Sequence, residues 1–128
     1  MCRDQGIGVV PYSPLARGLL AGTRTRDGAG HTPRARTDTS DRTDTSDRTA
    51  DFDVAEAVQA VATEHGLPPA RIALSWLFSK GDVTAPLIGA TRKQHVDDAV
   101  GALALRLDRE EISRLEAPYL PRLLSDYS

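Results

Sequence analysis

The sequence of 128 residues predicts a partial α/β domain with about two parallel strands, four helices and a long polar loop. Two short apolar segments have the composition of strands that are buried on both faces. Four longer segments carry apolar residues at the spacing of amphipathic helices. Strands and helices alternate along the chain, which is typical of parallel α/β architecture. Two strands are too few to form a stable sheet without neighbours.

The first predicted strand covers residues 7–12, a run rich in β-branched side chains that follows Gly6. Pro14 and Gly18 then break the chain into a turn. No segment before this strand offers it a partner. We therefore expect that the chain lacks an upstream part of its domain.

Residues 23–50 are expected to form a flexible polar loop. The segment contains no Val, Ile, Leu, Met, Phe, Trp or Tyr, and the hexamer at residues 36–41 is repeated at residues 42–47. Such a segment cannot bury enough apolar area to offset its ordering entropy, which is about 1–2 kcal/mol per residue for the backbone.

Two helices are predicted after this loop. Asp53, with Glu56 three residues later, has the pattern of a capping box, and Gly66 is expected to end the helix that begins there. Pro69 then opens a second helix. Its apolar residues at 72–78 cover most of the circumference, which predicts heavy burial.

The second predicted strand, residues 83–88, precedes two further helices. Thr91 and Gln94 form a possible capping pair for the third helix, and Asp108 and Glu111 form one for the fourth. The expected apolar face of the third helix contains Val96, Ala99, Val100 and Leu103.

Composition excludes several classes of function. A formal net charge of −2 does not favour binding to nucleic acid or to an anionic membrane surface. The single cysteine, Cys2, cannot form an internal disulfide, which is compatible with a reducing compartment. The apolar run near the N-terminus is too short for a signal peptide or a membrane span. We therefore expect a cytoplasmic protein without nucleic-acid or membrane partners.

Two turns, each directly after a predicted strand, carry the candidate functional residues. In the first turn, Tyr12 can stack on a flat heterocycle, while Ser13 and Arg17 suit a pyrophosphate. In the second, Arg92 and Lys93 lie in the first turn of a helix, where the macrodipole favours a bound anion. The alternatives are a plain turn with a packed tyrosine, and two cations that extend into water.

The two turns and the helices between them resemble the aldo/keto reductase family. Residues 12–20 (Tyr-Ser-Pro-Leu-Ala-Arg-Gly-Leu-Leu) resemble the loop after the family's seventh strand, and residues 69–77 resemble its buried seventh helix. Residues 85–92 and 94–99 resemble the eighth strand and the helix that binds the cofactor. Residues 107–116 resemble the last helix. The similarity covers the chain except for the polar loop.

This resemblance implies that residues 1–128 are one partial domain, the C-terminal portion of a (β/α)8 TIM barrel. The family consists of oxidoreductases that transfer hydride between NADPH and a carbonyl carbon. The resemblance implies that Tyr12 stacks on the nicotinamide ring. It also implies that the pyrophosphate of the cofactor, NADP(H), is lined by Ser13, Leu15 and Arg17.

The second turn is implied to bind the adenosine end of NADP(H). Thr91 and Arg92 match positions that hold the 2′-phosphate, and His95 matches a position near that phosphate. Asp98 matches an acidic position near the adenine amine. Some members of the family carry a Lys-Ser pair at the positions of Gly89 and Ala90, so side-chain recognition of the phosphate would fall to Arg92, with Lys93 as an alternative.

The family's general acid is a tyrosine supported by Lys, Asp and His, all placed after strands two to four. Those strands are absent from this chain, so we expect no catalytic residue here, no metal ligand, and a carbonyl substrate only in a complete barrel. Whether the chain is itself an enzyme stays open. The alternatives are a fragment that assembles with a complementing N-terminal chain or a second copy, and a truncated gene product without function.

Overall fold

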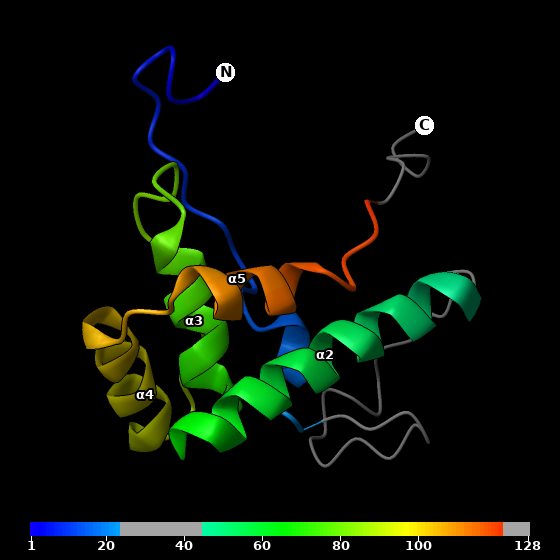
Figure 1. The fold of residues 1–128 in the computed structure, drawn as a ribbon. Helices are drawn as coiled ribbons and strands as arrows, with labels where there is room; N and C mark the ends of the chain where they lie inside the picture. Colours follow the sequence, from blue (N-terminus) through cyan, green and yellow to red (C-terminus); the bar gives the residue numbers. More distant parts are fainter. Residues whose placement is uncertain (24–44, 122–128) are drawn as a thin grey trace.

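The computed structural model describes residues 1–23 and 45–121, and it is shown in Figure 1. Its helices are the short 3-10 helix η1 (Ala16–Gly18), α2 (Thr45–His65), α3 (Pro69–Ser79), α4 (Lys93–Ala104) and α5 (Arg109–Glu116). α3 packs against α4 and α2, and α5 packs against α2. Among the described residues, no helix combines the length and the apolar composition needed to cross a bilayer.

The two predicted strands pair in parallel, but as isolated bridges rather than as a continuous ladder. Val9 pairs with Val83, and Tyr12 pairs with Leu87. From residue 9 to 12 the first segment advances three residues, and from residue 83 to 87 the second advances four, so the register shifts by one residue. Within the described residues, the expectation of two regular strands is therefore wrong.

The sequence of the paired segments explains the interrupted ladder. Pro11 and Pro86 have no backbone N–H and cannot donate to a ladder. The N–H of Val9 donates to the side-chain Oγ1 of Thr84 over 3.0 Å instead of to a backbone carbonyl. Apolar side chains of both segments are exposed in the described part of the structure: Ile7, Val10 and Leu87.

Helix α2 starts earlier than the sequence predicts. Asp53 lies inside the helix and is not its cap, and residues 45–50 of the expected polar loop are helical. Helix elongation adds one hydrogen bond for each ordered residue, so an established helix can extend through polar residues that would not nucleate one. The rest of the expected loop, residues 24–44, lies outside the described residues.

The C-terminal end of α2 is a Schellman motif, as the glycine after it predicts. Gly66 has a φ of 63°, in the left-handed region. Its N–H donates to the carbonyl oxygen of Thr63 over 3.1 Å, and the N–H of Leu67 donates to that of Ala62 over 3.0 Å. The prediction that Gly66 ends the helix is confirmed.

Helix α3 is the centre of the core. Pro69 occupies its first turn, as predicted, because the missing N–H of proline costs nothing there. One side of α3 packs into a cluster with α2 and α5, which contains Val58, Val61, Ala62, Ile72, Ala73 and Leu115. The other side packs into a cluster with α4, which contains Leu74, Ala99 and Ala102. We call these the α2-side cluster and the α4-side cluster.

Helix α4 differs from the prediction in its cap and in its packed face. Its N-cap is Arg92, without a side-chain capping hydrogen bond, so the expected cap at Thr91 is wrong. Nε2 of Gln94 instead donates a hydrogen bond to Asp98 Oδ1 over 3.1 Å. Small residues face α3, whereas the larger apolar residues of the expected face are exposed: Val96, Val100 and Leu103.

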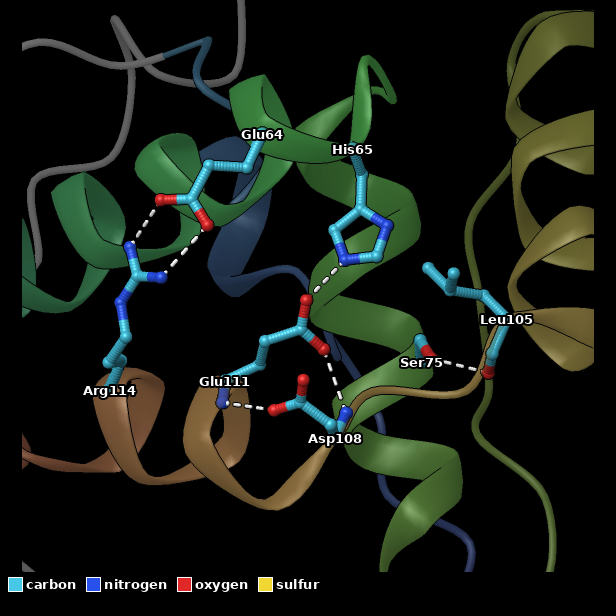
Figure 2. Close-up of polar contacts among 7 residues, drawn as sticks. All are labelled: Glu64, His65, Ser75, Leu105, Asp108, Glu111 and Arg114. Atoms are coloured by element: carbon cyan, nitrogen blue, oxygen red, sulfur yellow. Dashed lines mark hydrogen bonds and ion pairs between the residues drawn. The ribbon is translucent and has the colours of Figure 1, made fainter.

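The N-terminus of α5 has the predicted capping box. The N–H of Glu111 donates to Asp108 Oδ1 over 2.8 Å, and the N–H of Asp108 donates to Glu111 Oε2 over 2.7 Å (Figure 2). The second carboxylate oxygen of Glu111 lies 2.5 Å from Nε2 of His65, the last residue of α2. The cap therefore also joins α5 to α2.

Candidate functional site

The bridge between Tyr12 and Leu87 brings the two candidate turns to one edge of the molecule. The N–H of Leu87 donates to the carbonyl oxygen of Pro11 over 2.8 Å. Because the paired segments run in the same direction, the turns that follow them leave from the same end. We call residues 13–18 the Ser13 turn and residues 89–95 the Thr91 turn.

The Ser13 turn has an unusual backbone. Ser13 and Ala16 have φ values of 50° and 48°, in the left-handed region that residues with a side chain rarely adopt. The N–H of Ala16 donates to the carbonyl oxygen of Ser13 over 2.9 Å, which closes the turn. Strained residues of this kind persist only where the surrounding structure holds them, and they gather at functional sites.

Gly18 closes the same turn in a conformation that requires glycine. Its φ is 99°, and a Cβ at this position would lie 2.3 Å from Oγ1 of Thr23. The hydroxyl of Thr23 donates to the carbonyl oxygen of Gly18 over 2.8 Å. Any larger residue at position 18 would therefore displace this hydrogen bond.

The predicted residues of the Ser13 turn, and Tyr12 directly before it, have different environments. The side chain of Tyr12 is 75% exposed, and Ser13 is exposed. Leu15 packs against both core clusters, so its side chain anchors the turn. Arg17 lies in η1, and its side chain is outside the described part of the structure.

The predicted residues of the Thr91 turn are exposed at the N-terminus of α4: Gly89, Thr91, Arg92 and His95. The N–H of Thr91 donates to His95 Nδ1 over 3.3 Å, which folds the turn back on the helix. Lys93 Nζ lies 3.4 Å from Asp97 Oδ2, whereas Arg92 forms no ion pair within the described residues. An unpaired cation beside uncapped N–H groups is suited to an anion.

Asp98 has different surroundings from the predicted residues of the Thr91 turn. It is buried, and its Oδ1 accepts hydrogen bonds from Nη2 of Arg71 on α3 and from Nε2 of Gln94, both over 3.1 Å. Arg71 was not predicted from the sequence. The signal that could have found it is Gly101, a glycine inside a helix, which usually indicates close packing.

The carboxylates with shifted pKa values lie away from both turns. Hydrogen bonds from the Arg114 guanidinium hold the pKa of Glu64 below its ordinary value. Figure 2 shows this bidentate pair between α5 and α2. Hydrogen bonds from Lys80 and then Trp76 lower the pKa of Glu116. The Lys80 ammonium also lies 4.7 Å from the centre of the Trp76 ring. These contacts join α5 to α2 and to the C-terminal end of α3.

The parallel bridges, and the helices that follow each paired segment, are typical of an α/β fold. The model of the aldo/keto reductase family matches residues 1–119. The chain therefore belongs to the aldo/keto reductase family, which confirms the resemblance noted in the sequence.

Relatives of known name are longer than this chain. A versiconal hemiacetal acetate reductase of Aspergillus parasiticus is 33% identical over 126 residues, which cover 96% of this chain and 35% of that protein. An aldo-keto reductase of Alternaria alternata is 36% identical over 119 residues, which cover 92% of this chain and 30% of that protein. The chain thus spans about a third of the length of these relatives.

Solved structures support the α/β fold. The glycerol dehydrogenase of Gluconobacter oxydans has a TM-score of 0.69 at 21% identity, over 98% of this chain and 38% of that one. A thermostable aldo-keto reductase solved with the inhibitor epalrestat has a TM-score of 0.60 at 24% identity, over 92% of this chain and 32% of that one. Sequence identity this low shows the fold alone.

Proposed function

We propose that this chain is the NADP(H)-binding, C-terminal portion of an aldo/keto reductase TIM barrel. The observation that carries the proposal is the Tyr12–Leu87 bridge, which joins the two segments that lead into the Ser13 turn and the Thr91 turn. In α/β barrels a phosphate site frequently lies after strands seven and eight, at a helix N-terminus. Family membership and this geometry together favour a dinucleotide that extends from one turn to the other.

The Ser13 turn fits the nicotinamide and pyrophosphate end of the cofactor. The exposed ring of Tyr12 offers a flat apolar face for stacking on the nicotinamide. The Ser13 hydroxyl, the backbone of Leu15 and the Arg17 guanidinium would line the pyrophosphate. The bound cofactor supplies the hydride chemistry, and these residues hold and orient it.

The Thr91 turn fits the adenosine 2′-phosphate, which distinguishes NADP from NAD. Arg92 is exposed and forms no ion pair in the described part of the chain, so its guanidinium is available to the phosphate. Thr91 and His95 lie beside it at the helix N-terminus. Gly89 is exposed, and nothing lies within 4 Å of where its Cβ would be, so the backbone can approach the ligand.

We further propose that the chain alone does not reduce carbonyl compounds. By the family resemblance, the acid tyrosine and its Lys, Asp and His partners belong to strands that lie outside residues 1–128. Proton transfer by a positioned acid contributes about 10²–10⁴-fold to a reaction rate. A complete barrel would supply that acid and the pocket for the aldehyde or ketone.

A second candidate function is assembly with another polypeptide, because two apolar surfaces are exposed in the described part of the chain. One lies on α4 and the other on the paired segments: Val96, Val100 and Leu103, and Ile7, Val10 and Leu87. Uncovered strand edges and apolar faces are typical of interaction surfaces. The occupant would be a complementing N-terminal barrel portion or a second copy of the chain.

Purified chain can be mixed with NADPH and methylglyoxal, alone and together with the N-terminal two thirds of the Alternaria relative. We expect no turnover by the chain alone and measurable turnover in the mixture. Turnover by the chain alone, well above background, would refute catalytic incompleteness. Size-exclusion chromatography of the same samples tests assembly. A chain that elutes as a compact monomer and does not bind the added portion would contradict the assembly function.

A further inference from the structure

Arg71 on α3 holds the carboxylate of Asp98 across the interface with α4. Its Nη2 donates to Asp98 Oδ1 over 3.1 Å, and the two side chains are 24% and 9% exposed. Asp98 and Ser75 are the buried polar residues of the described part of the chain. Because a buried carboxylate that loses its partner keeps an uncompensated charge, the pair constrains how α4 sits on α3.

Gly101 allows the Arg71 guanidinium to lie directly against the backbone of α4. A Cβ at position 101 would stand 2.7 Å from Cζ of Arg71 and 2.8 Å from its Nε. Glycine weakens a helix interior relative to alanine, so its presence here has a packing reason. The guanidinium thus lies against the helix one turn beyond Asp98, and its Nε is buried there without a hydrogen-bond partner in the described part of the chain.

Gln94 extends this contact to the first turn of α4. Its Nε2 donates to the same Oδ1 of Asp98 that accepts from Arg71, over 3.1 Å. Gln94 lies between Arg92 and His95 in the sequence. A side chain of α3 is therefore connected, through one carboxylate oxygen, to the turn that presents Arg92.

We propose that Arg71 is a positioning residue for the 2′-phosphate end of the site. It holds Asp98, and through Asp98 it holds Gln94, so that the Thr91 turn keeps the orientation in which Arg92 meets the phosphate. The inference rests on the proposed function, and it gives Asp98 a role different from the adenine contact that the family resemblance implies. Arg71 itself touches no cofactor atom.

The first test is the preference for NADPH over NADH, measured by equilibrium titration of the full chain. In Arg71→Met we expect the ratio of the two affinities to fall about tenfold, the size of one charge-assisted hydrogen bond. Arg71→Lys should restore part of the ratio. The matched control is Arg114→Met, which removes an arginine–carboxylate pair between α5 and α2 and should leave the ratio unchanged. An Arg71→Met variant that loses both affinities equally would overturn the proposal.

A second measurement needs no cofactor. Hydrogen exchange of the amides at residues 91–98 should be about tenfold faster in Arg71→Met than in the wild type, with α2 and α5 unchanged. Unchanged exchange would overturn the positioning role. If Arg71→Met does not fold, Gly101→Ala displaces the guanidinium while the charge is kept, and it should accelerate the same amides. A wild-type chain without NADPH preference would refute the proposed function, and the exchange rates would still decide the role of Arg71.

Discussion

The backbone N–H of Leu87 donates to the carbonyl oxygen of Pro11 over 2.8 Å, beside the parallel bridge between Leu87 and Tyr12. Within the described residues, no later backbone hydrogen bond joins the two segments. This contact therefore sets the distance between the Ser13 turn and the Thr91 turn. A dinucleotide that binds both turns depends on it.

Replacing Leu87 by proline tests this contact. Leu87→Pro removes the donor, whereas Leu87→Ala keeps it and removes the same exposed side chain. We expect Leu87→Pro to lower the free energy of unfolding by about 1 kcal/mol more than Leu87→Ala, the net value of one hydrogen bond. Urea denaturation followed by circular dichroism measures the difference. Equal effects of the two substitutions would show that the hydrogen bond does not hold the segments together.

Gly18 should tolerate no side chain. Gly18→Ala combines a φ of 99° with a Cβ 2.3 Å from Thr23 Oγ1, so we expect a loss of about 1–3 kcal/mol in stability. Gly89→Ala is the matched control, because nothing lies within 4 Å of its Cβ and its φ is not positive. Urea denaturation of the two variants measures how much stability each one loses. Equal losses would contradict the prediction for Gly18.

The capping box of α5 should contribute measurably to stability. Asp108→Ala removes the acceptor for the Glu111 N–H, and such substitutions typically cost about 1 kcal/mol. Asp97→Ala breaks only an exposed pair with Lys93 on α4, which is worth a few tenths of a kcal/mol, roughly 0.2–0.5. Thermal unfolding should therefore separate the two variants. An Asp108→Ala variant as stable as Asp97→Ala would mean that the capping box contributes nothing.

Acid should weaken the contacts of α5. The pKa values of Glu64 and Glu116 lie below the ordinary carboxyl value of 4.5, chiefly because of hydrogen bonds from Arg114 and Lys80. A lowered folded-state pKa means that the stabilisation is present above the ordinary value and is lost as the pH falls through the lowered values. We expect the Tm to be steady above the ordinary value of 4.5 and to fall below it.

Glu116→Gln should make that acid-induced fall in Tm less steep, because the variant has no carboxylate to protonate at this position. Glu110→Gln removes an exposed carboxylate from the same helix and serves as the control. If Glu116→Gln and the wild type lost the same Tm in acid, the pairing of Glu116 with Lys80 would not be a source of the pH dependence.

Features that depend on neighbouring residues could be predicted from the sequence. Gly66 ends α2, Pro69 begins α3, and Asp108 and Glu111 cap α5, because each acts on backbone groups within a few residues of itself. The two strand-end turns were identified for a similar reason, since a turn follows directly from the residues that form it.

Features that depend on distant contacts could not be predicted. α4 has two apolar stripes, and periodicity does not reveal that the small residues Ala99 and Ala102 pack on α3 while Val100 stays exposed. The inward orientation of Asp98 depends on Arg71, which lies on another helix. The early start of α2 follows from cooperative elongation of the helix. A capping pattern at Asp53 does not predict that the helix extends to residues before it.

The most direct test of the central claim is the affinity of the chain for NADPH and for NADH, before and after Arg92→Ala. We expect the wild-type chain to bind NADPH more tightly than NADH, in a salt-sensitive manner, because in the proposed site the 2′-phosphate would meet the Arg92 guanidinium at a helix N-terminus. Arg92→Ala should reduce NADPH affinity about tenfold or more and leave NADH affinity unchanged. An Arg92→Ala variant with unchanged NADPH affinity would contradict the assignment of the 2′-phosphate site.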